Sequence, residues 1–186
     1  IDIDNAEFAK TMSTDLSIQA DAVEFLKEFL GKLKKQKTSL DFSQWLNTCR
    51  RTEKKYPLVY SKTGKLKPQE VIAHVAEHIK KGCTVVTDVG QHQMFAAQYF
   101  PVDRPNRFIT SGGLGTMGFG VPAAMGAAIG TNDIICLFVG DGGFQMTMQE
   151  LSVISNRNLP VKIFILDNAC LGMVRQWQEL FYQKHY

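Results

Sequence analysis

NDIICLFVGDGGFQMTMQELSVISNRNLPVKIFILDNACLG, at residues 132–172, is the stretch that decides the fold of this chain. It contains two short apolar runs, residues 134–139 and 161–166, which are rich in β-branched residues and bounded by turn residues. Such runs are typical of strands that are buried on both faces. The segment between them, residues 145–155, has helical character, so we expect a strand–helix–strand unit with parallel strands. The fold class predicted from this unit is α/β, a parallel sheet with helices on both faces.

Polar side chains follow each of these two strands. Gly140-Asp141-Gly142-Gly143 comes after the first strand, and Asp167-Asn168 comes after the second. Ligands of open parallel sheets bind at the carboxyl ends of the strands. Oxygen ligands beside bare glycines therefore indicate a hard cation together with a phosphate group.

Magnesium is the cation that suits this pattern, because it usually takes one or two protein side chains together with phosphate oxygens. Asp141 would supply the charged ligand and Asn168 a neutral carbonyl oxygen, with a backbone carbonyl near Cys170 as a third. Gly142 and Gly143 would let the backbone approach a diphosphate at the N-terminus of the following helix.

Composition and charge exclude several classes of protein. The chain is 45% hydrophobic and 21% charged, as in ordinary globular proteins, and its net charge of +3 gives no reason to expect binding to nucleic acid or to a membrane. Its apolar runs are far shorter than the roughly 20 residues that span a bilayer. None of the four cysteines forms a CxxC pair, so we expect reduced thiols and a cytoplasmic protein.

The N-terminal third of the chain is expected to be mainly helical and to belong to a separate domain. Residues 1–3 have strand character, and amphipathic helices are expected at residues 20–33 and 40–54. A polar segment marked by glycine and proline follows, and we place a domain boundary there. Because the chain opens without an initiator Met and closes without a helix stop signal, we expect it to be a fragment.

Two further motifs have competing interpretations. The expected helix at residues 68–82 contains His74, Glu77 and His78, which match the HxxEH pattern of a class of zinc proteases. No third ligand stands out downstream, and the histidines lie on the polar face of the helix. A plain exposed face is therefore favoured over zinc chemistry.

The second motif is a glycine-rich segment. Gly113, Gly115 and Gly118 satisfy GxGxxG, and Asp141 lies near the spacing of a ribose-binding acid, which would indicate NAD or NADP. That interpretation leaves Asp167-Asn168 unexplained, and glycines needed only for packing remain an alternative. His92, near a strand end and a helix N-terminus, is equally consistent with anion binding and with packing.

Taken together, Gly140-Asp141-Gly142 and the later Asp167-Asn168 resemble the signature of thiamine-diphosphate enzymes, although Asp167 stands where that signature has Asn. Three neighbouring stretches narrow the resemblance to the large catalytic subunit of the biosynthetic, FAD-containing acetohydroxyacid (acetolactate) synthases. They are DVGQHQM at residues 88–94, TSGGLGTMGFG at 110–120 and LGMVRQWQELFY at 171–182. The resemblance implies the end of an FAD-binding, Rossmann-like middle domain at residues 1–35, a linker with a helix at 36–66, and a diphosphate-binding domain at 67–186.

The resemblance also implies roles for individual residues. Mg²⁺ would be held by Asp141, Asn168 and the carbonyl of Cys170. The cofactor would be contacted by Gln91, His92, Gly115, Met117, Gly142, Gly143, Leu171 and Gly172, with the Gly115 carbonyl accepting from the aminopyrimidine and Met117 as an apolar wedge. Met173 and Trp177 would line the substrate pocket.

The implied activity is the condensation of two pyruvates, or of pyruvate with 2-oxobutyrate, with loss of CO₂, in branched-chain amino-acid synthesis. Its cofactors would be thiamine diphosphate, Mg²⁺ and FAD. Its partners would be further large subunits, as a homodimer or homotetramer, and a small regulatory subunit. The catalytic Glu of this family belongs to an upstream pyrimidine-binding domain, so this chain would be inactive alone. Pyruvate oxidase, a 2-oxoacid decarboxylase and a non-catalytic NAD-binding module are the alternatives.

Overall fold

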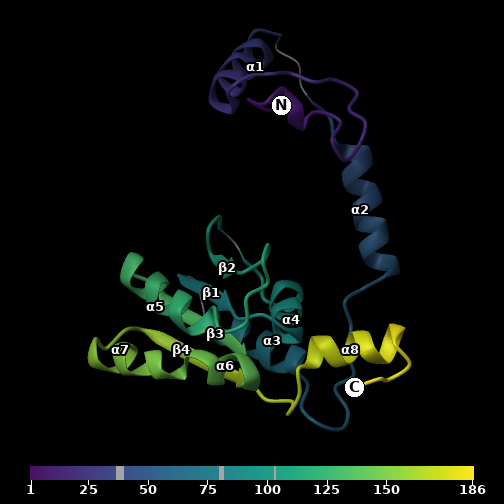
Figure 1. The fold of residues 1–186 in the computed structure, drawn as a ribbon. Helices are drawn as coiled ribbons and strands as arrows, with labels where there is room; N and C mark the ends of the chain where they lie inside the picture. The colour runs from purple at the N-terminus through teal and green to yellow at the C-terminus, as the bar shows by residue number, and fades with distance from the viewer. Residues whose placement is uncertain (37–39, 80–81, 103) are drawn as a thin grey trace. The chain divides into compact units, whose positions relative to one another are not determined.

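A computed structural model describes residues 1–36, 40–79, 82–102 and 104–186 of the chain. The chain divides into two compact units, Ile1–Pro57 and Leu58–Tyr186 (Figure 1). The boundary of the units follows Pro57, whereas the predicted linker extends to residue 66. No described helix combines the length and the apolar character that crossing a membrane requires.

The described residues of the first unit form three helical elements. They are η1 (Asn5–Glu7), α1 (Ala22–Gln36) and α2 (Ser43–Lys55). Asp21 starts α1, because its carboxylate accepts the backbone N–H groups of Val23 and Glu24 at 2.8 and 3.2 Å. Neither α1 nor α2 has a buried residue.

The predicted strand at residues 1–3 is wrong. The segment forms only an isolated parallel bridge, in which Asp2 donates to the Ile18 carbonyl at 3.2 Å and accepts from Ala20 at 3.0 Å. Ile1 and Ile3 remain 57% and 71% exposed. A strand gains stability from packing a face and pairing an edge, and this segment does neither along its length.

The second unit is built on a four-stranded sheet in which every neighbouring pair is parallel, in the order β2-β1-β3-β4. The strands are β1 (Cys83–Thr87), β2 (Phe108–Thr110), β3 (Ile134–Gly140) and β4 (Val161–Leu166). The helical elements are α3 (Pro68–His78), α4 (Gln91–Tyr99), α5 (Gly120–Gly130), α6 (Asp141–Thr147), η2 (Met148–Glu150), α7 (Leu151–Asn156) and α8 (Gly172–Phe181). The predicted α/β class with a parallel sheet is confirmed.

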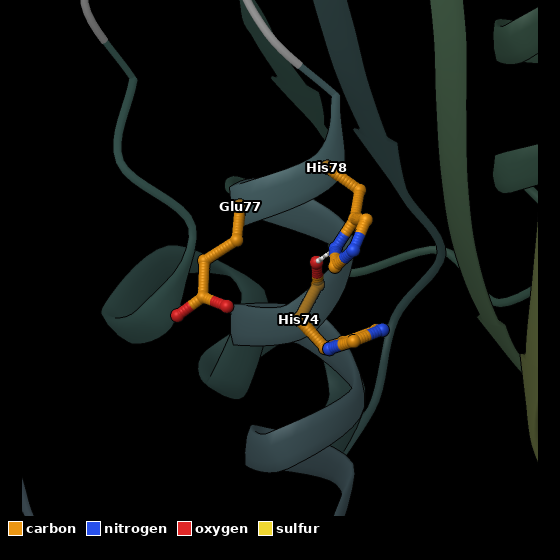
Figure 2. Close-up of side chains that lie close together, drawn as sticks. All are labelled: His74, Glu77 and His78. Atoms are coloured by element: carbon orange, nitrogen blue, oxygen red, sulfur yellow. Dashed lines mark hydrogen bonds between the residues drawn. The ribbon is translucent and has the colours of Figure 1, made fainter.

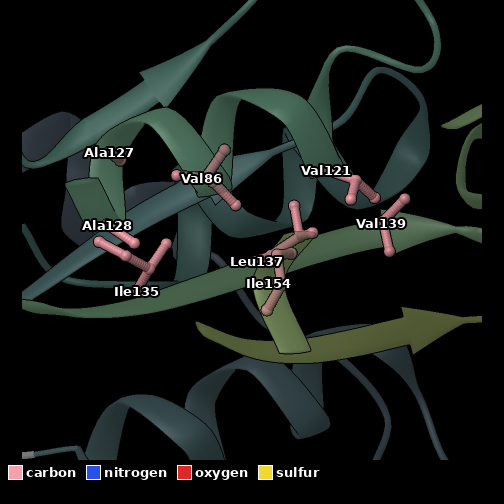
Figure 3. Close-up of a cluster of buried hydrophobic side chains, with 9 residues drawn as sticks. Val86, Val121, Ala127, Ala128, Ile135, Leu137, Val139 and Ile154 are labelled. Atoms are coloured by element: carbon pink, nitrogen blue, oxygen red, sulfur yellow. The ribbon is translucent and has the colours of Figure 1, made fainter. Parts of the chain in front are cut away.

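Side chains of the two central strands alternate between two apolar layers. On one face, Leu137 and its neighbours on β1 and β3 pack against α5 and α7 (Figure 3). On the other face, Phe138 packs with residues of α3 and α4 and lies between the rings of Phe100 and Phe164, at centroid distances of 6.0 and 5.2 Å. Helices therefore cover both faces, as burial of a parallel sheet requires.

The strand order changes direction between β1 and β3. From β1 it passes to β2 on one side, and from β2 it crosses to β3 on the other side of β1. The connection that follows β1 therefore leads to β2 on one side, and the connection that follows β3 leads to β4 on the other side. Open α/β sheets bind ligands at such a switch point. The residues that follow β1 and β3 are Asp88 and Asp141.

Candidate functional site

Within the part of the chain that the structure describes, four helices begin at the edge where the strands end. Gln91 opens α4 after β1, Gly120 opens α5 after β2, Asp141 opens α6 directly after β3, and Gly172 opens α8 after β4. Helix N-termini carry unpaired N–H groups and partial positive charge, so this edge favours a negatively charged ligand.

The helix after β3 starts earlier than the sequence indicates. We predicted it from residue 145, but α6 begins at Asp141 and includes Gly142 and Gly143. Gly143 is buried against Asp88, and a Cβ at Gly143 would lie 2.8 Å from Asp88 Oδ2. Glycine serves here to let a helix approach a carboxylate closely, and it does not break the helix.

Asp88 is a buried residue that holds the glycine-rich loop in place, and our sequence analysis missed this role. Its side chain is 0% exposed and accepts the backbone N–H of Gly118 with both oxygens at 3.0 Å and that of Gly120 at 3.3 Å. These bonds attach the glycine-rich loop after β2 to the end of β1. The sequence offers only a weak signal, an acid directly after the strand, followed by Val89 and Gly90.

The His92 ring packs against two glycines, Gly90 and Gly140, near the carboxyl ends of β1 and β3. A Cβ at Gly90 or at Gly140 would lie 2.8 or 3.2 Å from its Cε1, so both positions allow the ring to pack against backbone. The side chain is 7% exposed, and its Nε2 is buried without a hydrogen-bond partner. Burial lowers the pKa of His92, against the opposing effect of the Asp88 and Asp141 charges. A buried polar atom without a partner is unusual in a folded protein and is the feature expected where a polar ligand belongs.

Three residues predicted to contact the cofactor come together around α6. A Cβ at Gly142 would lie 3.2 Å from Leu171 Cδ2 and 3.6 Å from Met117 Cε. Met117 comes from the loop after β2 and Leu171 from the segment after β4, so three separate connections meet at Gly142. Gly115, in the loop of Met117, adopts φ +65°, which favours glycine at that position.

The predicted magnesium ligands lie at the ends of neighbouring strands. Gly140 pairs with Leu166 in register, so Asp141 and Asp167 are the next residues on each strand. Asn168 Oδ1 accepts from the Cys170 N–H at 3.2 Å, and Asn168 Nδ2 donates to Gln91 Oε1 at 3.4 Å. The same Asn168 oxygen also accepts from the Cys170 thiol at 3.5 Å. Because a thiol is a weak donor, a cation would take its place on that lone pair. One carboxylate, one amide and one backbone carbonyl form a donor set that fits Mg²⁺ with phosphate oxygens.

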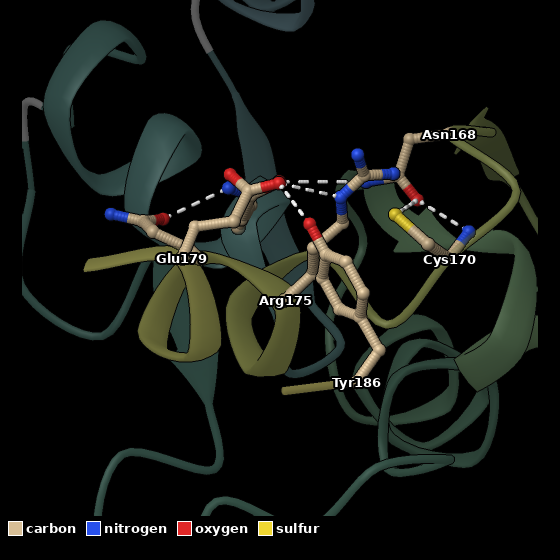
Figure 4. A network of polar contacts seen from close by, with 7 residues as sticks. Asn168, Cys170, Arg175, Glu179 and Tyr186 are labelled. Carbon is tan, nitrogen blue, oxygen red and sulfur yellow. Dashed lines mark hydrogen bonds and ion pairs between the residues drawn. The ribbon is translucent and has the colours of Figure 1, made fainter. Parts of the chain in front are cut away.

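Helix α8 is attached to this edge through Gln91, whose Nε2 donates to Gln176 Oε1 at 2.8 Å. Along α8, Glu179 Oε1 accepts from Arg175 Nε and from the Tyr186 hydroxyl, each at 2.9 Å (Figure 4). The hydrogen bond from Arg175 lowers the pKa of the Glu179 carboxyl, and the hydrogen bond to Glu179 raises the pKa of Tyr186.

The two predicted substrate-pocket residues also lie on α8. Met173 is half-buried and Trp177 is 56% exposed, one turn further along the helix. The Trp177 ring packs against Phe181, with centroids 4.9 Å apart. Their role at a substrate stays a prediction.

The chain matches one protein family and several curated proteins. The family described as thiamine pyrophosphate enzyme, C-terminal TPP binding domain, matches residues 88–186. The acetolactate synthase large subunit of Lactococcus lactis subsp. lactis is 45% identical over 187 residues, which cover 99% of this chain and 32% of that protein. Acetolactate synthase 2, chloroplastic, of Nicotiana tabacum is 45% identical over 188 residues, which cover 98% of this chain and 28% of that protein.

The chain thus spans about a third of the length of the curated relatives it matches. The family match includes the glycine-rich loop after β2, the start of α6 at Asp141 and the segment after β4, and so it favours thiamine pyrophosphate over a dinucleotide at this edge. The sequence signature, the parallel sheet and the family match agree, and the chain belongs to the thiamine pyrophosphate enzymes.

Proposed function

We propose that this chain is the diphosphate- and Mg²⁺-binding part of an acetolactate synthase, which condenses two pyruvates, or pyruvate with 2-oxobutyrate, with loss of CO₂. The observation that carries the proposal is the buried, unpartnered Nε2 of His92 beside Gly140, at the strand ends where the glycines and oxygen donors meet. Thiamine diphosphate, the same compound as thiamine pyrophosphate, supplies the carbon–carbon bond chemistry when bound.

The residues of this chain bind and orient the cofactor in this proposal. Asp141, Asn168 and the Cys170 carbonyl hold Mg²⁺. The diphosphate lies near His92, and an anion there favours the charged imidazolium, against the effect of burial. The cofactor contacts at the edge are Gln91, His92, Gly142, Gly143, Leu171 and Gly172.

The remaining roles concern the organic part of the cofactor and the substrates. The Gly115 carbonyl accepts from the aminopyrimidine, and Met117 supports the cofactor from its apolar side. Met173 and Trp177 face the 2-oxoacids. The similarity to acetolactate synthases over nearly the whole chain favours this activity over that of a pyruvate oxidase or a 2-oxoacid decarboxylase.

The assembled enzyme in this proposal is a cytoplasmic homodimer or homotetramer of large subunits with a small regulatory subunit, and FAD binds mostly outside this chain. The synthase reaction also needs the Glu of the pyrimidine-binding domain. We therefore expect the 186-residue chain by itself to form no acetolactate.

Calorimetric titration of the chain with thiamine diphosphate and Mg²⁺, and separately with NAD, tests the proposal. We expect thiamine diphosphate to bind only when Mg²⁺ is present, and NAD not to bind. Asp141→Asn should weaken binding at least about tenfold, because the only charged protein ligand of the cation is lost. Asp167→Asn is the matched control, since it restores the residue of the family signature and should retain binding. NAD binding that survives Asp141→Asn would overturn the proposal.

A further inference from the structure

A cluster of metal-ligating side chains lies on α3, in the second unit. His74, Glu77 and His78 are all exposed, and each offers a ligand atom within 4.8 Å of the others (Figure 2). Residues three and four positions apart lie on the same side of a helix, so one helix is enough to bring the three together. Within the described residues, this is the one group of three or more His, Cys, Asp or Glu side chains that meets this spacing.

The hydrogen bonding of His78 prepares its ring for a metal. His78 Nδ1 lies 2.8 Å from the backbone oxygen of His74. A carbonyl only accepts, so Nδ1 carries the hydrogen and Nε2 of the neutral ring keeps a free lone pair. Metal-ligating histidines commonly donate their other ring N–H to a backbone carbonyl, which fixes the tautomer and the ring orientation. The rings of His74 and His78 lie close, with centroids 4.1 Å apart.

The donor types select the kind of ion. Two imidazoles and one carboxylate form a common zinc ligand set, and water completes the tetrahedron. Magnesium and calcium prefer oxygen ligands alone, so the His74–Glu77–His78 cluster differs in chemistry from the proposed Mg²⁺ site. The cluster also occupies the C-terminal end of α3, where the helix dipole favours a positive charge.

In an HxxEH protease the glutamate before the second histidine acts as the base. In this chain the Glu77 carboxylate has an oxygen within 4.8 Å of a ligand atom of each histidine, so it is available as the third ligand. We propose that His74, Glu77 and His78 form a surface binding site for one Zn²⁺ per chain. The bound ion links two successive turns of α3 and so stabilises the end of a helix whose Ile72 and Val75 belong to the core.

Calorimetric titration of the chain with ZnCl₂, in a buffer that does not chelate zinc, tests this site. One ion per chain is expected. His74→Ala and His78→Ala should each weaken binding at least about tenfold, because losing a ligand costs no less than losing a residue that hydrogen-bonds to a ligand. Glu77→Gln should weaken binding by a smaller but measurable factor. Zinc should also raise the melting temperature of the wild type, and at the same zinc concentration it should raise that of His74→Ala less.

Two matched controls separate this site from other zinc ligands. His185→Ala removes an exposed histidine outside the cluster, and Cys49→Ser removes an exposed thiol, so both variants should bind zinc like the wild type. All substituted positions are exposed, and far-UV circular dichroism checks that each variant folds. Absence of zinc binding, wild-type affinity in both histidine variants, or one ion shared by two chains would overturn the proposal. Wild-type affinity in Glu77→Gln would overturn the assignment of three ligands.

Discussion

Gly143 of α6 lies directly against the carboxylate of Asp88, and a Cβ at Gly143 would be 2.8 Å from Asp88 Oδ2 and 2.9 Å from its Cγ. Asp88 cannot retreat, because backbone N–H groups of Gly118 and Gly120 hold both of its oxygens. The contact joins the helix that begins at Asp141 to the end of β1. It therefore fixes the carboxyl end of β3 relative to the carboxyl end of β1.

Gly143→Ala should lower the free energy of unfolding by about 1–3 kcal/mol, because the added methyl group overpacks a fully occupied space. Urea unfolding followed by circular dichroism measures the change. Gly126→Ala is the matched control, since Gly126 lies in α5 with no atom within 4 Å of the added Cβ. That variant should gain about 0.5–1 kcal/mol from better helix propensity. Equal stability of the two variants would contradict the close contact between Gly143 and Asp88.

Asp88→Asn should also destabilise the second unit. The amide has one oxygen in place of two, so its NH₂ group would face a backbone N–H that now lacks an acceptor. Leaving buried donors unsatisfied costs about 1–3 kcal/mol. Asp167→Asn provides the comparison in the same unfolding assay. Asp167 is exposed, and its Oδ1 accepts from Ala169 at 2.9 Å, which an Asn oxygen can also do, so stability should hardly change.

His92 should make stability depend on pH in one direction. Burial lowers the pKa of His92 from 6.5 in the folded protein, so below about pH 6.5 the unfolded state binds a proton that the folded state does not. Stability should therefore fall as the pH is lowered through 6.5 and continue to fall until the folded-state pKa is reached. The facing charges of Asp88 and Asp141 reduce the effect without reversing it.

Urea unfolding of the wild type and His92→Gln at pH 7.5 and pH 5.5 measures this contribution. The quantity compared is the change in unfolding free energy between the two pH values, so a general loss of stability in the variant does not affect the result. We expect a smaller change in His92→Gln. The same change in both proteins would show that His92 is not responsible.

Phe138 should be among the most sensitive positions of the core. It is 0% exposed and lies between Phe100 and Phe164, so Phe138→Ala should cost about 3–5 kcal/mol of unfolding free energy. Phe181→Ala is the control with the same change of side chain. Phe181 is 63% exposed, and its loss should change stability by no more than about 0.5 kcal/mol. Thermal denaturation of the two variants beside the wild type would show the difference.

The strands β3 and β4 were predictable because their patterns depend on local sequence. The runs at residues 134–139 and 161–166 are short, apolar and flanked by turn residues, and they became β3 and β4 with one residue of difference. The strand predicted at residues 1–3 failed because a few alternating apolar residues do not ensure a partner strand. The helix start at Asp141 was missed because Gly142 and Gly143 are usually signs of a turn.

The candidate site was predictable only in part. Asp141 and Asn168 were predicted as ligands because strand ends carry ligands in parallel sheets. The register of β3 and β4 brings these strand ends together, and binding of a cation there stays a prediction. The meeting of Met117 and Leu171 at Gly142 depends on three loops far apart in the sequence. Asp88 was overlooked because a buried carboxylate satisfied by backbone N–H groups has no distinguishing sequence pattern. Its role is a property of the packed structure.

The strand order β2-β1-β3-β4 also has a consequence for folding kinetics. β3 and β4 are joined by one short crossover, whereas Cys83 of β1 pairs with Ile134 of β3, 51 positions along the chain. Because closing a long loop must precede the contacts that reward it, pairing of β1 with β3 is the slower event. His92 follows β1 and Asp141 follows β3, so this pairing is what brings the two residues to the same edge of the sheet. The edge where the strands end is thus completed only in the last stage of folding. In a nascent or partly unfolded chain, the residues that follow β1 and those that follow β3 are still apart.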